Sequence, residues 1–598
     1  MPDQQPVTWA HGATRVGDHL TRFALWAPDA KRVSVVFDDG ESLPMIAEAE
    51  GWYVVESDCD VGTAYRYEID GDLQVPDPAS RAQVSDVHSQ SVVVGHGGYP
   101  WKHHGWQGRP WHEAVIYEVH AGLLGGFEGV AKHLPRLAAL GVTAIELMPI
   151  AEFPGDRNWG YDGVLPYAPE HAYGTPDQLK ALIDTAHENG LMVILDVVYN
   201  HFGPDGNFLH TYAKEFFRED KHTPWGAAID FRKPQVREFF IGNALMWLFD
   251  YRFDGLRFDA VHAIESPDFL QEMAKRIREN TPANRHIWLN LENEHNEAHL
   301  LQQGYNAQWN DDGHNALHVL LTGETEAYYA DYAEDTTGKL ARCLGEGFVY
   351  QGHTNRKGET RGEKSGHLHP ASFVLFLQNH DQIGNRAFGE RLVQLAPEPA
   401  LRAATTLLLA SPMIPLMFMG DEWGAKEPFQ FFTSFHGELA EAVRKGRRSE
   451  FEAFSAFQDP ERREKIPDPN APGTFEASRP AFTDLEHANH GGWVDLYRAL
   501  LNLRKRELVP QLTGCRSLGV EILGDKAVSA RWRLHDGSTW QIDLNLGDLP
   551  VAAQLPFETH VIFDSRTLGT QHALTTELPA FTALVSRIPA AVTEAVHE

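Results

Sequence analysis

Continuous apolar segments alternate with amphipathic segments through the middle of this chain, from about residue 114 to residue 422. Uninterrupted apolar runs are typical of parallel strands buried on both faces, and amphipathic segments between them are typical of the helices that cover such a sheet. Eight such units close into a (β/α)8 barrel. Seven strands are readily assigned, at 114–120, 144–150, 192–201, 254–262, 286–295, 372–381 and 414–422. The sixth is expected between Gly345 and Gly352, and the last helix at 493–508.

Both flanks of the barrel show short alternating strands separated by Gly, Asp and Pro, which favours antiparallel β-sandwiches. The sequence therefore predicts an N-terminal β-sandwich at 1–100, a catalytic barrel at 101–512 and a C-terminal β-sandwich at 513–598. The segment 95–110 is rich in Gly, Pro, His and Trp. Its tryptophans are expected to bury a domain junction in preference to stacking on sugars.

The charge balance restricts the partners of the chain. Lys and Arg total 52 against 83 Asp and Glu, a formal charge of −31, which opposes binding to nucleic acids and anionic membranes. A neutral substrate is expected. The three cysteines offer no disulfide framework, and no leader is visible at the amino terminus, so a cytoplasmic protein is expected. Pro412 and Pro415 divide the apolar stretch 403–420 into a helix and a buried strand. The oligomeric state is left open.

Polar side chains gather where four of the predicted strands end. They are Asp196, Asn200 and His201; Arg257, Asp259 and His262; Glu292, Asn293 and Glu294; and Asn379, His380 and Asp381. The carboxyl ends of barrel strands and the loops that follow them hold the active site in this architecture. A single group of this kind is explained by a helix cap or a solvated rim. Four groups at one mouth indicate chemistry, because crowded unpaired carboxylates cost stability.

Two carboxyl groups on either side of a glycosidic bond are the equipment of glycoside cleavage. Asp259 lies two residues from Arg257, whose charge would keep it ionised as a nucleophile. Glu292 ends an apolar strand, where burial would raise its pKa and make it the proton donor. Glu294 shares a strand face with Glu292, so spacing leaves both open. Asp381 would stabilise the charged transition state, and His201 and His380 would bind sugar hydroxyls.

The strand ends DVVYNH, GLRFDAVH, ENEH and FLQNHD resemble, in order and spacing, the four signature regions of the α-amylase family of glycoside hydrolases. The resemblance covers roughly residues 110–510. By position it implies that Asp259 is the nucleophile, Glu292 the acid/base and Asp381 the third carboxylate. It also implies that Arg257, His201, His380, Asn379 and Tyr161 line the sugar site, with Tyr161 as a stacking platform and Asp196 and Asn200 as framework.

Four further segments resemble one subgroup of that family, which cleaves the α-1,4 bond next to a terminal trehalose unit. They are 159–176, 291–296, 308–318 and 428–448. A non-reducing disaccharide needs extra groups beyond the cut, for which His262, Glu294, Asp311 and Asp312 are the candidates. The alternatives are a 1,4-α-glucan branching enzyme, which transfers the glycosyl unit to a sugar, and a non-catalytic glucan-binding protein. Only the hydrolase releases free trehalose, so reaction products distinguish it from the branching enzyme. A non-catalytic protein would keep its function in an Asp259→Ala variant.

No cofactor and no metal are expected. His295 and His299 have the spacing of helical zinc ligands, but HNEAH differs from the HExxH pattern. The segment after the third strand, 202–232, is short, so a structural calcium site is not expected. The glycines follow no phosphate-loop pattern.

Overall fold

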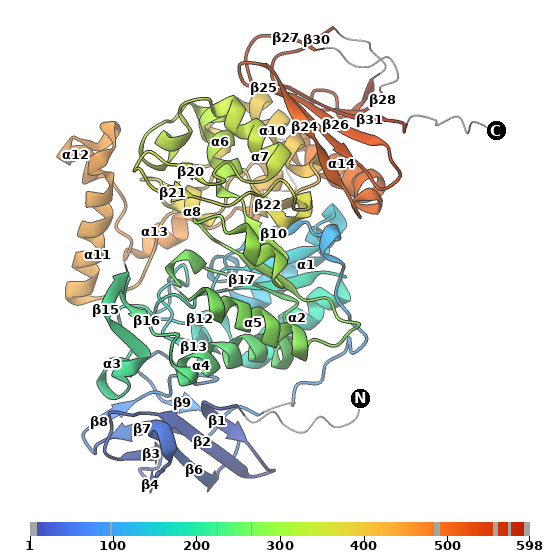
Figure 1. Cartoon of the computed structure of the whole chain (residues 1–598). Helices are drawn as coiled ribbons and strands as arrows, with labels where there is room; N and C mark the ends of the chain where they lie inside the picture. The colour runs from blue at the N-terminus through green and yellow to red at the C-terminus, as the bar shows by residue number, and fades with distance from the viewer. Residues whose placement is uncertain are drawn as a thin grey trace.

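The computed structural model describes residues 9–95, 98–223, 225–264, 266–482, 491–553, 560–571 and 576–590. Its centre is a closed barrel of eight parallel strands, which confirms the predicted fold class (Figure 1). The strands in order are β10 (Ile116–Val119), β11 (Ala144–Leu147), β14 (Met192–Val197), β17 (Gly255–Phe258), β18 (Trp288–Leu291), β19 (Ala307–Trp309), β22 (Phe373–Leu375) and β23 (Ile414–Phe418). Every residue of these strands is buried, as a sheet covered on both faces requires.

The prediction of the sixth strand was wrong. The sixth strand is β19, whereas 345–352 contains the end of α7 (Thr336–Glu346) and a buried loop. Three residues are too few to show a periodicity, so β19 has no signal of its own. The apolar residues after Gly347 form no strand, because side chains take the hydrogen bonds of their backbone amides. The amide of Phe348 donates to Ser365, and that of Val349 donates to Asp312.

Eight helices follow the barrel strands and cover them (Figure 1). They are α1 (Gly126–Leu140), α2 (Pro176–Glu188), α4 (Pro234–Leu245), α5 (Pro267–Asn280), α6 (Asp311–Thr322), α7, α10 (Glu398–Ala410) and α14 (Gly491–Leu503). Loops carry shorter helices and one long helix: α3 (Leu209–Tyr212), α8 (His380–Gly384), α9 (Leu392–Leu395), α11 (Gly437–Glu450), α12 (Pro460–Arg463) and α13 (Pro472–Ala477). The expected helix and strand within 403–420 are α10 and β23.

Local chemistry fixes where these helices begin and end. The Thr175 side chain accepts from the amide of Gln178, whose side chain in turn binds the Thr175 amide. This reciprocal cap, followed by Pro176, starts α2 at a defined residue. Gly141 ends α1 in the left-handed conformation, with φ of 114°. Each strand that follows therefore enters the barrel at a fixed register.

The tryptophans of 95–110 and Trp111 close the amino-terminal end of the barrel. The indole of Trp106 donates to Asp254 over 2.8 Å and stacks on His187. The indole of Trp111 donates to the carbonyl of Ala371 over 2.7 Å. These partners belong to the barrel itself, at the end of its strands opposite the predicted catalytic groups, so burial of a domain junction stays a prediction.

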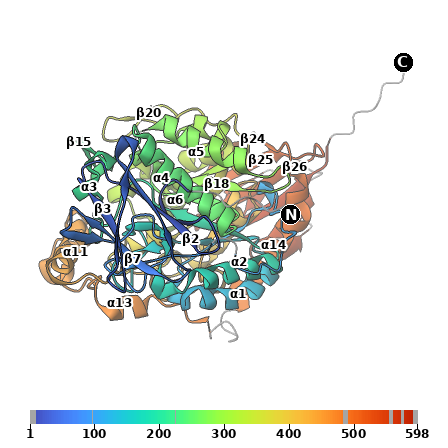
Figure 2. The same cartoon turned by 90° about the horizontal axis from the view of Figure 1, so that it is seen from below.

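Residues before the barrel form two facing antiparallel sheets, shown in blue in Figure 1 and in front of the barrel in Figure 2. One sheet has the order β1 (Gly12–Arg15), β2 (Leu20–Trp26), β6 (Trp52–Asp58) and β5 (Ile46–Ala47). The other has β4 (Ser42–Pro44), β3 (Val33–Phe37), β7 (Ala64–Ile69) and β8 (Leu73–Val75), with β9 (Ser91–Val92) beside β7. Phe23, Leu25, Val35 and Tyr65 are buried between the sheets.

Residues after α14 form antiparallel sheets of unequal size. Six strands pair in the order β24 (Arg516–Gly524), β25 (Ala527–Arg533), β26 (Thr539–Asn545), β31 (Thr582–Ile588), β28 (His560–Asp564) and β29 (Gly569–Gln571). A two-stranded ribbon joins β27 (Val551–Ala552) to β30 (Glu577–Leu578). Across the part of the chain that the structure describes, no helix has both the length and the apolar character to span a bilayer.

Candidate functional site

One guanidinium group joins three carboxyl groups at the carboxyl ends of the barrel strands. Arg257, at the end of β17, donates from one outer nitrogen to Asp196 and to Asp259, each over 2.8 Å. The other outer nitrogen donates to Oε2 of Glu292 over 2.7 Å. Arg257 is only 1% exposed. The carboxyl groups of Asp259 and Glu292 are therefore held close together, because they share one planar fork.

The backbone after β17 adds a second link between these carboxyl groups. Ala260 follows Asp259 in the left-handed conformation, with φ of 40°, which is uncommon for a residue with a side chain. Its amide donates to Oε2 of Glu292 over 2.8 Å. Asn200, from the loop after β14, donates to Oδ2 of Asp259 over 2.8 Å. Oε1 of Glu292 is left for a ligand.

The surroundings separate the protonation of the two groups. Burial opposes the charge of Asp259, but Arg257 and His201 hold the pKa of that carboxyl below its usual value. Burial raises the pKa of Glu292 well above its usual range; Arg257 opposes this, and the charges of Asp259, Asp311 and Asp381 add to it. The surroundings thus favour the ionised form of Asp259 and the neutral form of Glu292, the combination that glycoside cleavage requires.

Tyr161 and His380 form one wall of the site. The Tyr161 hydroxyl donates to Asp196 over 2.7 Å and lies 2.9 Å from Nε2 of His380, on which the Tyr161 ring also stacks. Glu118, at the end of β10, accepts from the His380 ring over 2.5 Å. Burial lowers the pKa of His380, but Glu118 more than offsets this, so the pKa is raised. Sequence reasoning missed Glu118, although a glutamate inside an apolar strand is a recognisable signal.

Asp381 and Asn379 lie side by side but differ in exposure. Asp381 is the second residue of the short helix α8, and Asn385 donates to its carboxylate over 2.6 Å. Asn379 is 1% exposed, and its side-chain oxygen accepts from the amides of Asp381 and Gln382 as the helix cap. Asn379 is therefore buried as the cap of the helix that carries Asp381, and its contact with sugar stays a prediction.

His201 also differs from its predicted use. Its Nε2 lies 2.8 Å from the carbonyl oxygen of Tyr161, and its Nδ1 is in contact with the side-chain oxygen of Asn200. Both ring nitrogens are engaged within the protein, so a sugar hydroxyl reaches them only by displacing a contact. The face of the ring stacks on Trp225, which is 48% exposed.

A cavity of about 970 Å³ opens from the catalytic groups. Glu292, Asp381, His262, Glu294 and Asp311 line it, while Asp259 is not among its described lining residues. Burial raises the pKa of Asp311 to about 7, with the charge of Arg361 opposing and that of Asp381 adding. Further lining side chains that sequence reasoning missed include Arg361, Tyr332, Tyr328, Arg386, Phe388, Phe454 and Phe457. They lie on short elements and loops with no motif of their own: Arg361 is on β21 (Thr360–Arg361), and Tyr328 and Tyr332 are on a 3-10 helix (Ala327–Tyr332).

Asp312 does not reach this cavity, so its predicted contact with the disaccharide is corrected. It is 1% exposed. Its carboxylate accepts from Asn296 over 2.9 Å, from the Tyr332 hydroxyl and from the amide of Val349. Adjacent helical residues face different directions, so Asp311 points to the cavity while Asp312 anchors the loop after α7.

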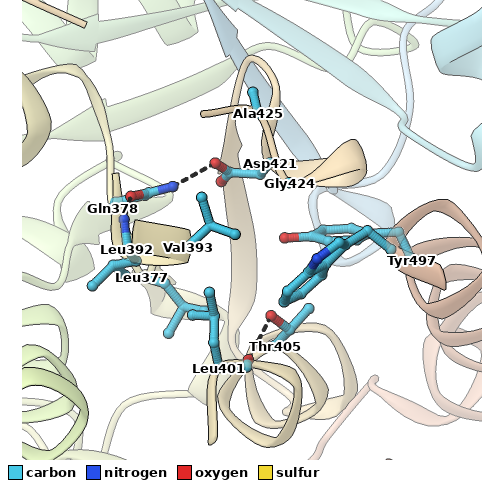
Figure 3. Close-up of a pocket in the computed structure, with 11 residues that line it drawn as sticks. Leu377, Gln378, Leu392, Val393, Leu401, Thr405, Asp421, Gly424, Ala425 and Tyr497 are labelled. Atoms are coloured by element: carbon cyan, nitrogen blue, oxygen red, sulfur yellow. Dashed lines mark hydrogen bonds between the residues drawn. The ribbon is translucent and has the colours of Figure 1, made fainter. Parts of the chain in front are cut away.

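A second hollow, of about 20 Å³, lies between α10 and α14 (Figure 3). Gln378 donates to Asp421 over 2.7 Å across it, and Leu401 and Tyr497 line the opposite side. Its volume admits a water molecule and excludes a sugar ring. The hollow therefore belongs to the packing of the barrel.

One group of side chains has the composition of a metal site. Ligand atoms of Glu152, Glu170 and His171 lie within 4.8 Å of one another, away from the cleft. Both carboxyl groups already accept hydrogen bonds, Glu152 from the ring and amide of His171 and Glu170 from the amides of Phe153 and Ala172. This cluster ties β12 (Ala151–Glu152) to the segment after β13 (Leu165–Pro169).

Known proteins resemble the chain over most of its length. It is 42% identical over 511 residues to the malto-oligosyltrehalose trehalohydrolase of Deinococcus radiodurans, covering 83% of each chain. It is 37% identical to the enzyme of that name from Rhizobium sp., covering 95% of this chain and 97% of the other. The chain belongs to the malto-oligosyltrehalose trehalohydrolase family. It is a glycoside hydrolase, and a family model described as the α-amylase catalytic domain matches residues 90–227.

Structural similarity agrees with membership of the malto-oligosyltrehalose trehalohydrolase family. A solved structure of a putative α-amylase from Salmonella typhimurium has a TM-score of 0.91 and 41% identity, covering 97% of this chain and all of that one. A family model of unknown function matches residues 515–585, in the C-terminal sheets. A 1,4-α-glucan branching enzyme from Pseudoalteromonas atlantica is 37% identical over only 42% of this chain and 39% of its own length.

Proposed function

We propose that this chain hydrolyses the α-1,4-glucosidic bond next to the terminal trehalose of maltooligosyltrehalose, releasing trehalose and a maltooligosaccharide with retention of configuration. The observation that carries the proposal is the Arg257 fork, which holds Asp259 and Glu292 together. The surroundings lower the pKa of Asp259 and raise that of Glu292. A separation of about 5 Å between carboxyl groups suits retention, because the nucleophile attacks the sugar directly. Carboxyl groups that share one guanidinium favour this short separation.

The proposed reaction has two displacements. Asp259 attacks the anomeric carbon while Glu292 protonates the departing oxygen, which breaks the glycosidic bond and leaves a covalent glucosyl-enzyme ester. Glu292, now a carboxylate, takes a proton from water, and the water oxygen displaces Asp259 from the same carbon. Asp381, together with the ionised Asp259, stabilises the positive charge that develops on the sugar.

The cavity supports the placement of trehalose on the leaving-group side. Glu292, the proposed proton donor to the departing oxygen, lines the cavity, whereas Asp259 does not belong to its described lining. His262, Glu294 and Asp311 lie beside Glu292 on this side and offer polar groups to sugar hydroxyls. Nε2 of His262 lies 3.9 Å from a Glu294 oxygen, a gap that a hydroxyl bridges.

Products from two substrates test the proposal. With maltotriosyltrehalose, the enzyme is expected to release trehalose and maltotriose in equal amounts. With maltopentaose, which has the same number of glucose units, turnover is expected to be far slower. Equal turnover of both substrates would demote the chain to a general amylase, and new α-1,6 branches would favour the transferase. A role in trehalose biosynthesis and a cytoplasmic location stay predictions.

A further inference from the structure

The barrel interior below the catalytic groups contains polar atoms that nothing in the described protein satisfies. Both carboxyl oxygens of Glu146, on β11, and both amide atoms of Asn290, on β18, have no hydrogen-bond partner in the described protein. The same holds for Nε of Arg257 and Nε1 of Trp309. All four residues are at most 1% exposed. Unsatisfied buried polar atoms are costly, so four such side chains in one place require an explanation.

The strand registers place these side chains together. Glu146, Arg257, Trp309 and Leu416 come from every second strand, and the ladder pairings put them at one height in the barrel. The guanidinium carbon of Arg257 lies 4.2 Å from the centre of the nearer Trp309 ring. Asn290 belongs to the layer beneath. Glu146 and Asn290 thus form the floor of the Arg257 site.

Burial and neighbouring charges decide the protonation state of Glu146. Burial raises its pKa well above the usual range; Glu118 and Asp196, at the ends of neighbouring strands, add to this, and Arg257 opposes it. The two outer nitrogens of Arg257 are already used by Asp196, Asp259 and Glu292. An ionised Glu146 would compete with these carboxylates for one positive charge. A neutral Glu146 leaves that charge to the catalytic pair.

We propose that Glu146 is a positioning residue: it fixes Arg257 from below, through buried water shared with Asn290 and the indole of Trp309. A carboxylic acid, an amide, a guanidinium nitrogen and an indole supply the donors and acceptors that buried water requires. Through Arg257, the floor sets the spacing of Asp259 and Glu292. The catalytic consequence of this role rests on the hydrolysis proposed above.

Three variants separate this role from filling space and from carrying charge. Glu146→Gln keeps the shape and the neutral state. Glu146→Leu keeps the approximate volume but removes the hydrogen bonds. Leu416→Met changes another side chain of the same layer with little change in volume and serves as the control. The measurements are kcat, KM, the pH profile of kcat/KM and the thermal midpoint.

Glu146→Gln is expected to keep kcat within about 2-fold and to leave the pH profile in place. Glu146→Leu is expected to lower kcat by about 10- to 100-fold with little change in KM, because small displacements of reacting groups have effects of this size. Its thermal midpoint is expected to fall, because the buried partners of Glu146 are left unsatisfied, so kcat is compared on the folded enzyme below that midpoint. Leu416→Met should leave all four quantities unchanged.

Two results would overturn the inference. If Glu146→Leu keeps wild-type kcat, Glu146 only fills space. If Glu146→Gln loses activity as Glu146→Leu does and its pH profile shifts, Glu146 acts as a charged group. Should Glu146→Leu not fold, Asn290→Leu tests the same floor, with the same kcat loss expected and an unchanged kcat contradicting it. The variants are compared with wild type on any α-glucan that it cleaves, so a failed trehalose assay counts against the proposed function alone.

Discussion

Arg257 contacts both catalytic carboxyl groups, so the other neighbours of each group explain how the two take different roles. Asp259 is 8% exposed and the side chain of Glu292 is 23% exposed, and this burial favours the neutral form of each. Asp259 also has His201 and Asn200 beside it, and these contacts tip it toward the ionised form. Glu292 faces the charges of Asp259, Asp311 and Asp381, which tip it toward the neutral form. At the scale of single residues, the neighbours of each carboxyl group assign its role.

Replacing Glu292 by glutamine tests the proton donor. Glu292→Gln keeps the hydrogen bonds that the side chain accepts but has no proton to give, so kcat should fall by about 10²- to 10⁴-fold. Glu294→Gln is the matched control, because Glu294 lies two residues away and lines the same cavity. It should change KM for maltotriosyltrehalose more than kcat. A loss of kcat confined to Glu294→Gln would move the acid to that residue.

The pH profile of kcat/KM tests the division of protonation states. Activity requires Asp259 ionised, so it should fall at low pH as pH drops through a value below the usual aspartate range. Activity also requires Glu292 protonated, so it should fall as pH rises through a value well above the usual glutamate range. Because Asp259 and Glu292 interact, the two pKa values that the profile gives belong to the pair and not to either residue alone.

Asp311→Asn should move the alkaline limb of that profile to lower pH. Asp311 contributes a negative charge that raises the pKa of Glu292, and the amide removes that charge. If the alkaline limb does not move in the Asp311→Asn variant, the charge of Asp311 does not affect the pKa of Glu292. Asn315→Asp, which adds a carboxylate to the same cavity wall, gives a comparison of opposite sign.

At the scale of elements, short strands and caps position the catalytic groups. Seven barrel strands were predictable because their apolar runs are long, whereas β19 has three residues and no pattern. The carboxyl-end residues Asp259, Glu292 and Asp381 were predictable as a group, since strand ends meet at one mouth. The inward orientation of Asn379 and Asp312 was not predictable, because both are polar residues beside predicted site residues and only their contacts reveal that they face inward.

The cap of α8 offers a test at this scale. Asn379→Ala removes the oxygen that accepts from the amides of Asp381 and Gln382, so stability should fall by about 1 kcal/mol. Because Asp381 is the second residue of that helix, kcat should fall as well. Asn379→Ser retains a capping oxygen and should lose less of both. Chemical denaturation and steady-state kinetics on both variants give the comparison; equal kcat in Asn379→Ala and wild type would separate the cap from the orientation of Asp381.

At the scale of the whole molecule, the C-terminal sheets are joined to the barrel by buried polar contacts. The Trp540 indole, on β26, donates to the carbonyl of Ala410 at the end of α10 over 2.9 Å. Arg504, after α14, donates to the carbonyls of Leu409, Ser411 and Met413. These carbonyls lie at the end of α10 and in the segment between α10 and β23, so the last segments of the chain support the eighth barrel strand.

Arg504→Met should therefore destabilise the whole protein. The substitution leaves three buried carbonyl oxygens without their donor, at a cost of about 3 kcal/mol for the set. Arg506→Met is the matched control, because Arg506 lies two residues away with an exposed side chain paired to Glu507, and it should have little effect. Thermal midpoints of the two variants measure the difference. Equal midpoints would show that the carbonyls find other partners.

The anomeric form of the released maltotriose tests the central claim most directly. Attack by Asp259 and a second attack by water on the same carbon invert the configuration twice, so the new reducing end should be α. Proton NMR of the maltotriose released from maltotriosyltrehalose, recorded before mutarotation, reads this directly. An α signal that appears first and converts slowly to β is the predicted result, and an initial β signal would contradict the role of Asp259 as nucleophile.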